Sequence, residues 1–442
     1  MTATADLAEK TLSVAKNLGC DDVSIICADS NDSQVRFANN VITLVNCVHN
    51  LTLEVYVSKG AKRMIGATYN PTKNGIEKFV ANLVKSCAAL PASKDYVPLP
   101  DGPFQYRGHA NYDPKIIDAD LVGYVARAIE EGQKAGAKRV SGSLNTESTE
   151  MSILTSGGAS GSDRQSQILL NVRAFADDNA SGQGLSCSSY LSDFDPVAAG
   201  KKAGEDAKNS LNPKTISDGY YDVVFSSTVV ANILPVASNA SAFSIESGNS
   251  FLADKLGQDV AVRNLTIEDY GVYDNGLGGR IFDDEGIPTG KNEIVLKGRF
   301  TSMLHNSTTA KKFTAKTTGN AGIIGPRAST IVFSNGDSSL EEIIRDTKNG
   351  VLITNNWYTR YQNMRTGEYS TVPRDAAFRI GGGKITEPIA GLRVSDSIPR
   401  QLQNIQAISR ERDWVRWWEV STPTYAPAMK ISGVHITKAT GS

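Results

Sequence analysis

The chain has 442 residues, with 46 basic and 47 acidic side chains and a formal net charge of −1. This balance lacks the basic footprint of nucleic-acid or anionic-membrane binding, so we expect neither partner. The length favours two or more domains, and 40% hydrophobic residues supply sizeable cores.

The first part of the chain alternates helical and strand-like runs. Amphipathic helices are expected at 3–18 and about 72–90, where apolar residues recur every three or four positions. The expected strands lie at 22–28, 33–39, 41–47, 51–57 and 63–69. The Asn39-Asn40 turn predicts an antiparallel hairpin.

The same order then repeats. A helix at about 114–135 begins at a proline, and a helix at about 195–209 ends before another. Between them we expect strands at 138–147, 151–156, 166–176 and 182–191. Residues 1–215 are therefore interpreted as an N-terminal α+β domain with antiparallel sheets and helices, built from two halves of like element order.

From Tyr220 onward the pattern changes. A buried strand (YDVVFSS) precedes a Ser/Ala-rich helix at 227–243, in which Pro235 predicts a kink or a break. Beyond residue 257 short strands alternate with turns, apart from one helix at about 398–409. Residues 216–442 are thus expected to form a C-terminal β-rich domain, as a barrel or packed sheets.

The N-terminus and the cysteines indicate the compartment. The first residues lack a basic n-region and a continuous apolar core, and no stretch reaches the roughly 18 to 20 apolar residues of a membrane span. The five cysteines are odd in number and contain no C-x-x-C pair, as in a cytoplasmic protein with reduced thiols.

The four histidines are scattered, the nearest two being 60 positions apart at His49 and His109. No H-E-x-x-H can be written, so a helical zinc site is not expected in this chain. No G-x-S-x-G elbow occurs either, although a convergent serine hydrolase stays open.

Three adjacent acids, Asp283, Asp284 and Glu285, stand before a Gly-x-Pro turn. They could supply oxygen ligands to a divalent ion. The favoured alternative is a turn in which the acids sit at a loop tip or cap backbone N–H groups.

Two glycine-rich stretches have competing interpretations. TTGNAGIIGPR (317–327) could accept a peptide as an added strand or could be a plain surface loop. RIGGGKIT (379–386) departs from the phosphate-loop pattern, and a hairpin turn is favoured.

A cluster of arginines and tryptophans lies near the C-terminus, at Arg412, Trp414, Arg416, Trp417 and Trp418. It could stack on a base or on a partner. Because the chain is neutral overall, core packing or a protein interface is favoured.

Several segments, in order along nearly the whole chain, resemble the TldD/PmbA family. They are VRFANNVITLV (35–45), YDVVFSSTVVANIL (221–234), SFLADKLGQDVAVRNLTIEDYG (250–271), the D-D-E-G-x-x-T element at 283–289 and TTGNAG (317–322). In this family, TldD-type subunits carry H-E-x-x-x-H on the helix that opens the second domain, with a later cysteine as third ligand. PmbA-type (TldE) subunits lack these residues and pair with a TldD-type chain.

The corresponding segment here, 228–240, holds no histidine or glutamate, and no cysteine follows Cys187. The resemblance therefore implies a PmbA-like subunit without a cofactor of its own, with zinc expected in a TldD-type partner in a heterodimer or larger complex. It implies an extended peptide or unfolded protein as substrate, enclosed in a chamber. The segments expected to face that chamber or the partner are Asp283, Asp284, Glu285, Thr317, Thr318, Gly319 and Asn320.

Two other functions stay open. The chain could be a homo-oligomeric peptide-binding or scaffold protein without a protease partner, for example as a homodimer. It could also be an independent hydrolase whose activity a chelator does not affect.

Overall fold

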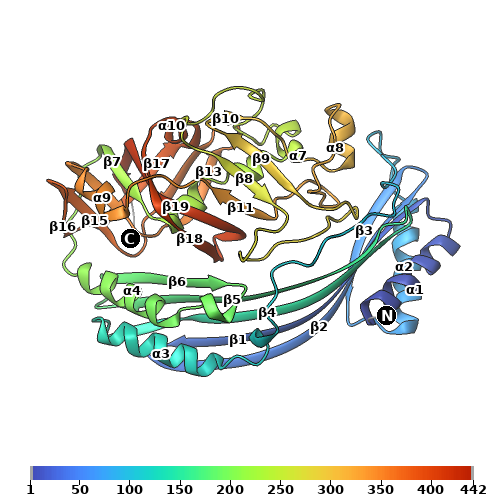
Figure 1. Cartoon of the computed structure of the whole chain (residues 1–442), viewed down its shortest axis with the longest axis horizontal. Coiled ribbons are helices and arrows are strands. Elements are labelled where there is room, and N and C mark those ends of the chain that lie inside the picture. Colours follow the sequence, from blue (N-terminus) through green and yellow to red (C-terminus); the bar gives the residue numbers. More distant parts are fainter. Residues whose placement is uncertain (1–2, 440–442) are drawn as a thin grey trace.

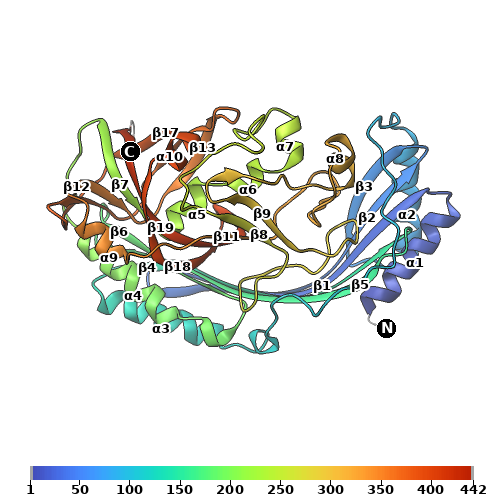
Figure 2. The ribbon, with the colours of Figure 1, turned by 45° about the horizontal axis from the view of Figure 1, so that its top comes forward.

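The computed structural model describes residues 3–439 and has an α+β architecture with one large sheet in each half of the chain. The sheet of the first half is an arch that passes under the second half (Figure 1). Turning the molecule shows the two sheets facing each other across their inner surfaces (Figure 2). The predicted α+β class is therefore confirmed.

The first sheet has six strands in the order β3-β2-β1-β4-β5-β6, and every neighbouring pair is antiparallel. The strands are β1 (Asp22–Ala38), β2 (Val41–Lys59), β3 (Lys62–Tyr69), β4 (Arg139–Thr155), β5 (Ser160–Phe175) and β6 (Ser181–Ser188). The predicted hairpin at Asn39 and Asn40 is present, and both residues have positive φ, as the tight turn requires.

The strands are longer than the sequence predicted. The expected strands at 22–28 and 33–39 are one strand, β1, and those at 41–47 and 51–57 are one strand, β2. The segments between the members of each pair, 29–32 (DSND) and 48–50 (VHN), are not predicted as strand. They pair with each other and continue both strands through the middle of the arch.

Two pairs of helices cover the outer face of the arch. They are α1 (Ala3–Asn17), α2 (Lys73–Ala88), α3 (Leu121–Lys134) and α4 (Pro196–Asn209). The expected helix at 114–135 is divided into a short 3-10 turn (Pro114–Ile116) and α3, because Asp120 caps the helix at the N–H of Gly123. A second 3-10 turn, Leu191–Asp193, precedes α4.

The helices cover the same face of β1 near both of its ends. Val23 and Ile25 are buried against α1 and α2 in one core, whereas Val35 and Phe37 are buried against α3 and α4 in another. All four positions are odd, and side chains alternate between the faces of a strand. The even positions of β1 therefore face the second half of the chain.

The second half contains a branched sheet of 13 strands, and it is open, without the closure of a barrel. Its main path is β10-β9-β8-β11-β19-β7-β12-β15-β16, with parallel pairing between β11 and β19 and between β7 and β12. The bounds are β7 (Gly219–Phe225), β8 (Ile267–Tyr270), β9 (Lys291–Leu296), β10 (Arg299–Phe300), β11 (Thr330–Phe333), β12 (Asn349–Ile353), β13 (Trp357–Asn363), β14 (Glu368–Val372), β15 (Ala377–Gly381), β16 (Lys384–Pro388), β17 (Leu392–Ser397), β18 (Ile405–Trp417) and β19 (Val420–Lys438).

Short helices surround this sheet. They are α5 (Ser227–Ile233), α6 (Val236–Asn239), α7 (Ala242–Glu246), α8 (Ser307–Lys312), α9 (Leu340–Arg345) and α10 (Ile398–Gln403). The break predicted at Pro235 separates α5 from α6. The helix expected at 398–409 ends at Gln403, because the chain continues into β18. The glycine-rich segment at 379–386 is a hairpin between β15 and β16, as predicted.

The segment between α4 and β7 contains residue 215, where the sequence suggested a domain boundary. The division into 1–215 and 216–442 stays a prediction. Among residues 3–439, no helix has both the length and the apolar character that a membrane crossing requires.

Helices α3 and α4 approach each other through glycines. A Cβ at Gly200 would lie 2.2 Å from the carbonyl oxygen of Ala128, and one at Gly204 would lie 2.3 Å from that of Gly132. No real Cβ contact is this short, so the two helix backbones can touch only where a side chain is missing.

We expect Gly200→Ala to destabilise the protein by about 1–3 kcal/mol, because the overpacked contact outweighs the gain in helix propensity of about 1 kcal/mol. Denaturant unfolding followed by circular dichroism measures this. Glu205→Ala, an exposed change on the same helix, is the matched control and should be nearly neutral. A stabilised Gly200→Ala variant would contradict the close contact.

Candidate functional site: the groove between the two sheets

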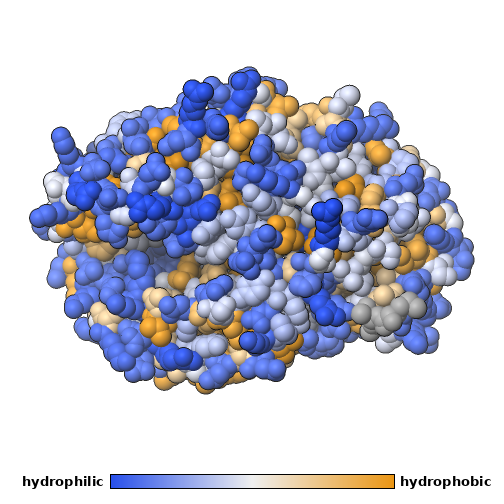
Figure 3. Space-filling model, viewed as in Figure 1, coloured by the Kyte–Doolittle hydropathy of each residue, from blue (hydrophilic) through white to orange (hydrophobic). Residues whose placement is uncertain are grey.

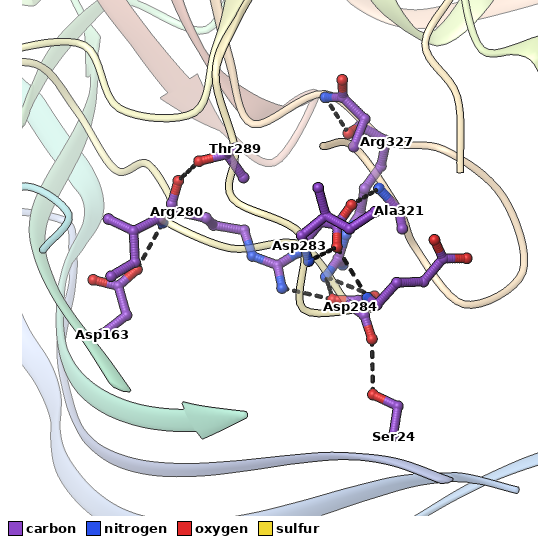
Figure 4. A network of polar contacts seen from close by, with 12 residues as sticks. Ser24, Asp163, Arg280, Asp283, Asp284, Thr289, Ala321 and Arg327 are labelled. Atoms are coloured by element: carbon purple, nitrogen blue, oxygen red, sulfur yellow. Dashed lines mark hydrogen bonds and ion pairs between the residues drawn. The ribbon is translucent and has the colours of Figure 1, made fainter. Parts of the chain in front are cut away.

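The acidic loop, residues 280–290 between β8 and β9, joins the two halves of the molecule. Its backbone meets the arch at two points: the Ser24 hydroxyl donates to the carbonyl of Asp284 (2.8 Å), and the Asp163 carboxylate accepts from the N–H of Ile281 (3.0 Å). Figure 4 shows both contacts. The Phe282 ring, fully buried, packs edge-on against Tyr106 with ring centroids 5.4 Å apart. The loop therefore holds the second sheet at a fixed place above the first.

Asp283 organises the loop itself. One carboxylate oxygen accepts from the N–H groups of Glu285 (3.0 Å) and Ile287 (2.9 Å), and the other accepts from Ala321 (2.9 Å). Its side chain is 1% exposed. Burial, and next the charge of Glu285, raises the pKa of Asp283 to about 7.

The other two acids have different partners. The Asp284 carboxylate pairs with Arg280 (2.6 Å) and Arg327 (2.9 Å), as Figure 4 shows. The Glu285 carboxylate accepts from the N–H (3.0 Å) and the hydroxyl (2.5 Å) of Ser307, at the start of α8. Burial raises the pKa of Glu285. Each carboxylate is thus engaged by protein donors, which matches the turn-and-capping interpretation.

The glycine-rich stretch lies directly against the acidic loop. Thr318 accepts from the N–H of His305 through its hydroxyl (2.8 Å), and Thr317 donates to the carbonyl of the same residue (3.3 Å). Gly319 has φ +69°, and a Cβ there would lie 2.6 Å from the carbonyl oxygen of Pro288. The close approach of the two loops therefore depends on a glycine.

Asn320 completes this contact from a buried position. Its side-chain N–H₂ donates to Asp269 (2.6 Å) and to the carbonyl of Arg327 (3.0 Å), and its oxygen accepts from Asn292 (2.9 Å). Burial raises the pKa of Asp269. The structure thus brings all seven predicted site residues together, yet the three acids and Asn320 are buried. Their expected role in facing a chamber or a partner stays a prediction.

Next to this junction, a groove runs between the inner face of the arch and the second sheet. It consists of two adjoining cavities of about 710 and 540 Å³, which share Glu147, Arg416 and Ser421. One cavity ends at the acidic loop, where Arg280 and Arg327 line it. The outer surface nearby carries mostly hydrophilic residues with scattered apolar ones (Figure 3).

The floor of the groove is mostly polar, with Val48 and Leu169 as its apolar members. Side chains from β1, β2, β4 and β5 with amide, hydroxyl or carboxyl groups form it: Asp32, Gln34, Asn46, Asn145, Glu147, Gln167 and Asn171. Gln34 donates to Asn145 across the strands (2.7 Å). Such groups bind peptide N–H and C=O groups without selecting a side chain.

A chain of hydrogen bonds crosses the groove from roof to floor. The Arg416 guanidinium on β18 donates to the Gln167 oxygen, and the Gln167 amide donates to Glu147. Glu147 lies opposite Asp32 in the strand register. Burial, and next the charge of Glu147, raises the pKa of Asp32. The floor therefore carries two neighbouring carboxyl groups, Asp32 and Glu147, in a partly desolvated environment.

Aromatic side chains form the roof beyond Arg416. Trp417 is 9% exposed and Trp418 is 57% exposed, and both line the larger cavity. Trp418 meets Trp357 edge-on at 5.3 Å, and the Arg374 guanidinium lies 3.4 Å from the Trp357 ring centroid. The roof thus offers an apolar surface opposite a polar floor.

The arginine-tryptophan cluster identified in the sequence has two roles. Trp414 stacks on Tyr425 at 4.7 Å and packs into the second sheet, whereas Arg416, Trp417 and Trp418 line the groove.

Sequence analysis missed the floor residues. Polar residues at every second strand position are a signal, but the signal does not say which face is enclosed.

The segment 228–240 lies inside the core of the second sheet. Val229, Val230, Ile233 and Val236 are buried there, and the side-chain N–H₂ of the buried Asn232 has no hydrogen-bond partner among the residues that the structure describes. Within residues 3–439, no group of three or more histidine, cysteine, aspartate or glutamate side chains is placed to hold a metal ion.

Comparison with known proteins gives two domain matches. Residues 111–211 match the PmbA/TldA metallopeptidase central domain, and residues 218–438 match the PmbA/TldA metallopeptidase C-terminal domain. A metalloprotease of Methanothermobacter thermautotrophicus is 30% identical over 221 residues, 48% of each chain. A PmbA homologue of Haemophilus influenzae is 29% identical over 216 residues, 48% of this chain and 46% of the relative.

The matched stretches thus span about half the length of these relatives. Among solved structures, TldE from Thermococcus kodakarensis has a TM-score of 0.85 at 19% identity, covering 98% of this chain and 100% of that one. This likeness establishes the same fold over 98% of this chain.

The raised pKa of Asp283 predicts a pH dependence of stability. Its folded pKa of about 7 exceeds the unfolded value of about 3.9. Between these two pH values the folded protein therefore keeps a proton that the unfolded chain has lost. The resulting stabilisation is fully present below about pH 4 and is lost as pH rises through about 7.

Urea unfolding at pH 5, 6.5 and 8 of wild type and Asp283→Asn measures this. Wild type should lose stability relative to the variant as pH rises, because the variant cannot ionise. Comparing the two proteins cancels the contributions of the other buried carboxylates to the pH dependence, because both proteins contain them. A constant difference between them across this range would contradict the assignment.

Proposed function

The chain belongs to the TldD/PmbA family of metallopeptidases, and on that premise we propose that it is a PmbA-like (TldE-like) subunit that holds an extended peptide for a zinc-bearing TldD-type partner. The observation that carries the proposal is the groove, with its polar floor and aromatic roof. The floor supplies hydrogen-bonding groups for a bound peptide, and the roof supplies an aromatic surface against which its apolar side chains pack.

The residues of this chain do not fit the family's zinc. The segment 228–240, where the resemblance places the histidine pair, carries buried valines, an isoleucine and Pro235. Neither carboxylate nor imidazole is available there to bind a metal or activate a water molecule. We therefore assign the metal to the partner and derive no chemical step in this chain.

The division of labour has a physical rationale. Holding a substrate in a reactive geometry converts a bimolecular encounter into an effectively unimolecular one. A subunit that supplies only this positioning contributes to peptide hydrolysis without any catalytic residue of its own. Homo-oligomeric peptide binding without proteolysis is the competing function, and it uses the same groove.

Affinity purification of the chain from its native extract tests the partnership. We expect a homologue bearing H-E-x-x-x-H to copurify, and the complex to cleave an unstructured peptide in a chelator-sensitive reaction. The pure chain should show no cleavage and no stoichiometric zinc. Zinc bound by its own side chains, or cleavage that resists chelator, would overturn the proposal.

A groove variant tests the binding role within the complex. Trp418→Ala removes an exposed aromatic surface and leaves the buried Trp417 in place, so we expect KM to rise roughly tenfold, equivalent to about 1.4 kcal/mol, with kcat little changed. Tyr220→Ala is the matched control, since Tyr220 is 70% exposed and stacks on His435 rather than lining the groove.

Initial rates of peptide hydrolysis over a series of substrate concentrations measure both constants. Equal KM values for Trp418→Ala and the control would show that the aromatic roof is not part of the peptide-binding site.

A further inference from the structure

The groove ends, away from the acidic loop, at an ion pair between floor and roof. On β5, Asp163 contacts the acidic loop, Gln167 and Asn171 line the larger cavity, and Arg173 is the next residue on the same face. The Arg173 guanidinium donates to the Asp375 carboxylate from Nε (3.1 Å) and Nη2 (2.6 Å). Asp375 belongs to the connection between β14 and β15, in the second half of the chain.

The Asp375 carboxylate has both oxygens occupied. Arg173 takes one oxygen, and the side-chain N–H₂ of Asn355 donates to the other (2.6 Å). The Asp375 side chain is 0% exposed. Arg374, the residue directly before it, makes no ion pair and no hydrogen bond through its side chain with any other residue that the structure describes. Two guanidinium groups therefore lie beside one carboxylate, and only one of them is paired with it.

The unpaired Arg374 guanidinium is held in place by stacking. It lies over the Trp357 ring, 3.4 Å from the ring centroid. An arginine that stacks on an aromatic face keeps the N–H groups at the edge of its plane available for an acceptor. Burial of part of the side chain, and next the charge of Arg173, lowers the pKa of Arg374, as expected where positive charge is in excess.

The aromatic platform under Arg374 adjoins the larger cavity. Trp357 meets Trp418, which lines that cavity, edge-on at 5.3 Å, and it meets Tyr358 edge-on at 4.6 Å. Tyr358 has φ +54°, a conformation that an aromatic residue rarely adopts, and its N–H donates to the Glu419 carboxylate (2.8 Å). Backbone strain of this kind is typical of binding sites.

The other arginines along the groove are already engaged. Arg280 and Arg327 pair with Asp284 at the acidic loop, and Arg416 donates to a floor amide. Arg374 differs from them because its donors are not used by the protein. An extended peptide in the groove would therefore find an available cation at this end.

We propose that Arg374 binds a carboxylate of the extended peptide and so anchors the peptide at this end of the groove. The inference rests on the proposed function and names the chemical group that the groove recognises. A guanidinium edge and a carboxylate match in shape and form two parallel hydrogen bonds. The carboxylate is either the C-terminus of the peptide or an aspartate or glutamate side chain, and an apolar side chain beside it packs against Trp418.

Three peptides test the anchor. They share one uncharged, unstructured sequence of ten residues with a neutral fluorophore at the N-terminus. The first has a free C-terminal carboxylate, the second a C-terminal amide, and the third a C-terminal amide with one central aspartate. Fluorescence anisotropy with the full-length chain gives a Kd for each peptide.

We expect at least one carboxylate peptide to bind wild type with a roughly tenfold lower Kd than the plain amide, because hydrogen bonds to a charged group are stronger than neutral ones. A gain confined to the first peptide assigns the site to the C-terminal carboxylate. An equal gain for the third peptide assigns it to carboxylates in general, including acidic side chains.

Arg374→Gln should abolish this gain and leave the Kd of the plain amide nearly unchanged. Arg374→Lys keeps the charge without the planar edge, so it should keep only part of the gain. Arg365→Gln is the matched control, since its side chain is 62% exposed and it removes the same charge away from the groove. It should retain the full gain. Circular dichroism checks that each variant is folded, and Arg374→Lys replaces Arg374→Gln if that one unfolds.

Equal Kd values of wild type for the three peptides would overturn the anchor, as would a carboxylate gain that survives unchanged in the folded Arg374 variants. Both results leave peptide binding itself intact, so the proposed function would stand without the anchor. A chain that binds none of the peptides would instead overturn the groove as a peptide site, and the anchor with it.

Discussion

The alternation of side chains along β1 is the constraint on which the other features depend. Over 17 residues the strand buries odd positions such as Val23 and Val35 under helices and turns even positions such as Ser24 and Gln34 inward. A slip of one residue would exchange the two faces, so the helix-covered cores fix the register. The groove floor is therefore a consequence of the packing on the opposite face of the same sheet.

The acidic loop converts this floor into an enclosed groove. Burying three carboxylates costs free energy unless each one is hydrogen-bonded. Here Asp283 binds backbone N–H groups, Asp284 binds two arginines and Glu285 binds the start of α8. These directional contacts restrict the conformation of the loop. The distance between roof and floor is then set by this polar network together with the apolar packing of Ile281 and Phe282 against the arch.

Local sequence patterns could predict individual helices, strands and turns, but not how these elements pack against one another. The Asn39-Asn40 hairpin, the break at Pro235 and the hairpin at 379–386 follow from turn chemistry within a few residues. The length of β1 does not follow from such local chemistry. Its polar middle has the composition of a loop and becomes a strand only through pairing with β2 and β4. The loops containing Asp283 and Asn320 were identified as candidates, but their burial depends on contacts between distant segments.

The charged groups of the groove are already engaged with one another. Arg416 is bound to Gln167, which is bound to Glu147, and Asp32 lies beside that pair. A general base must reach the proton it removes, and a carboxylate that accepts from a fixed amide has lost part of that capacity. Side chains that satisfy each other in this way form a rigid polar surface, which in the proposed function would hold an extended backbone. The arrangement is therefore better suited to positioning a substrate than to cleaving it, which is the role that the proposed subunit requires.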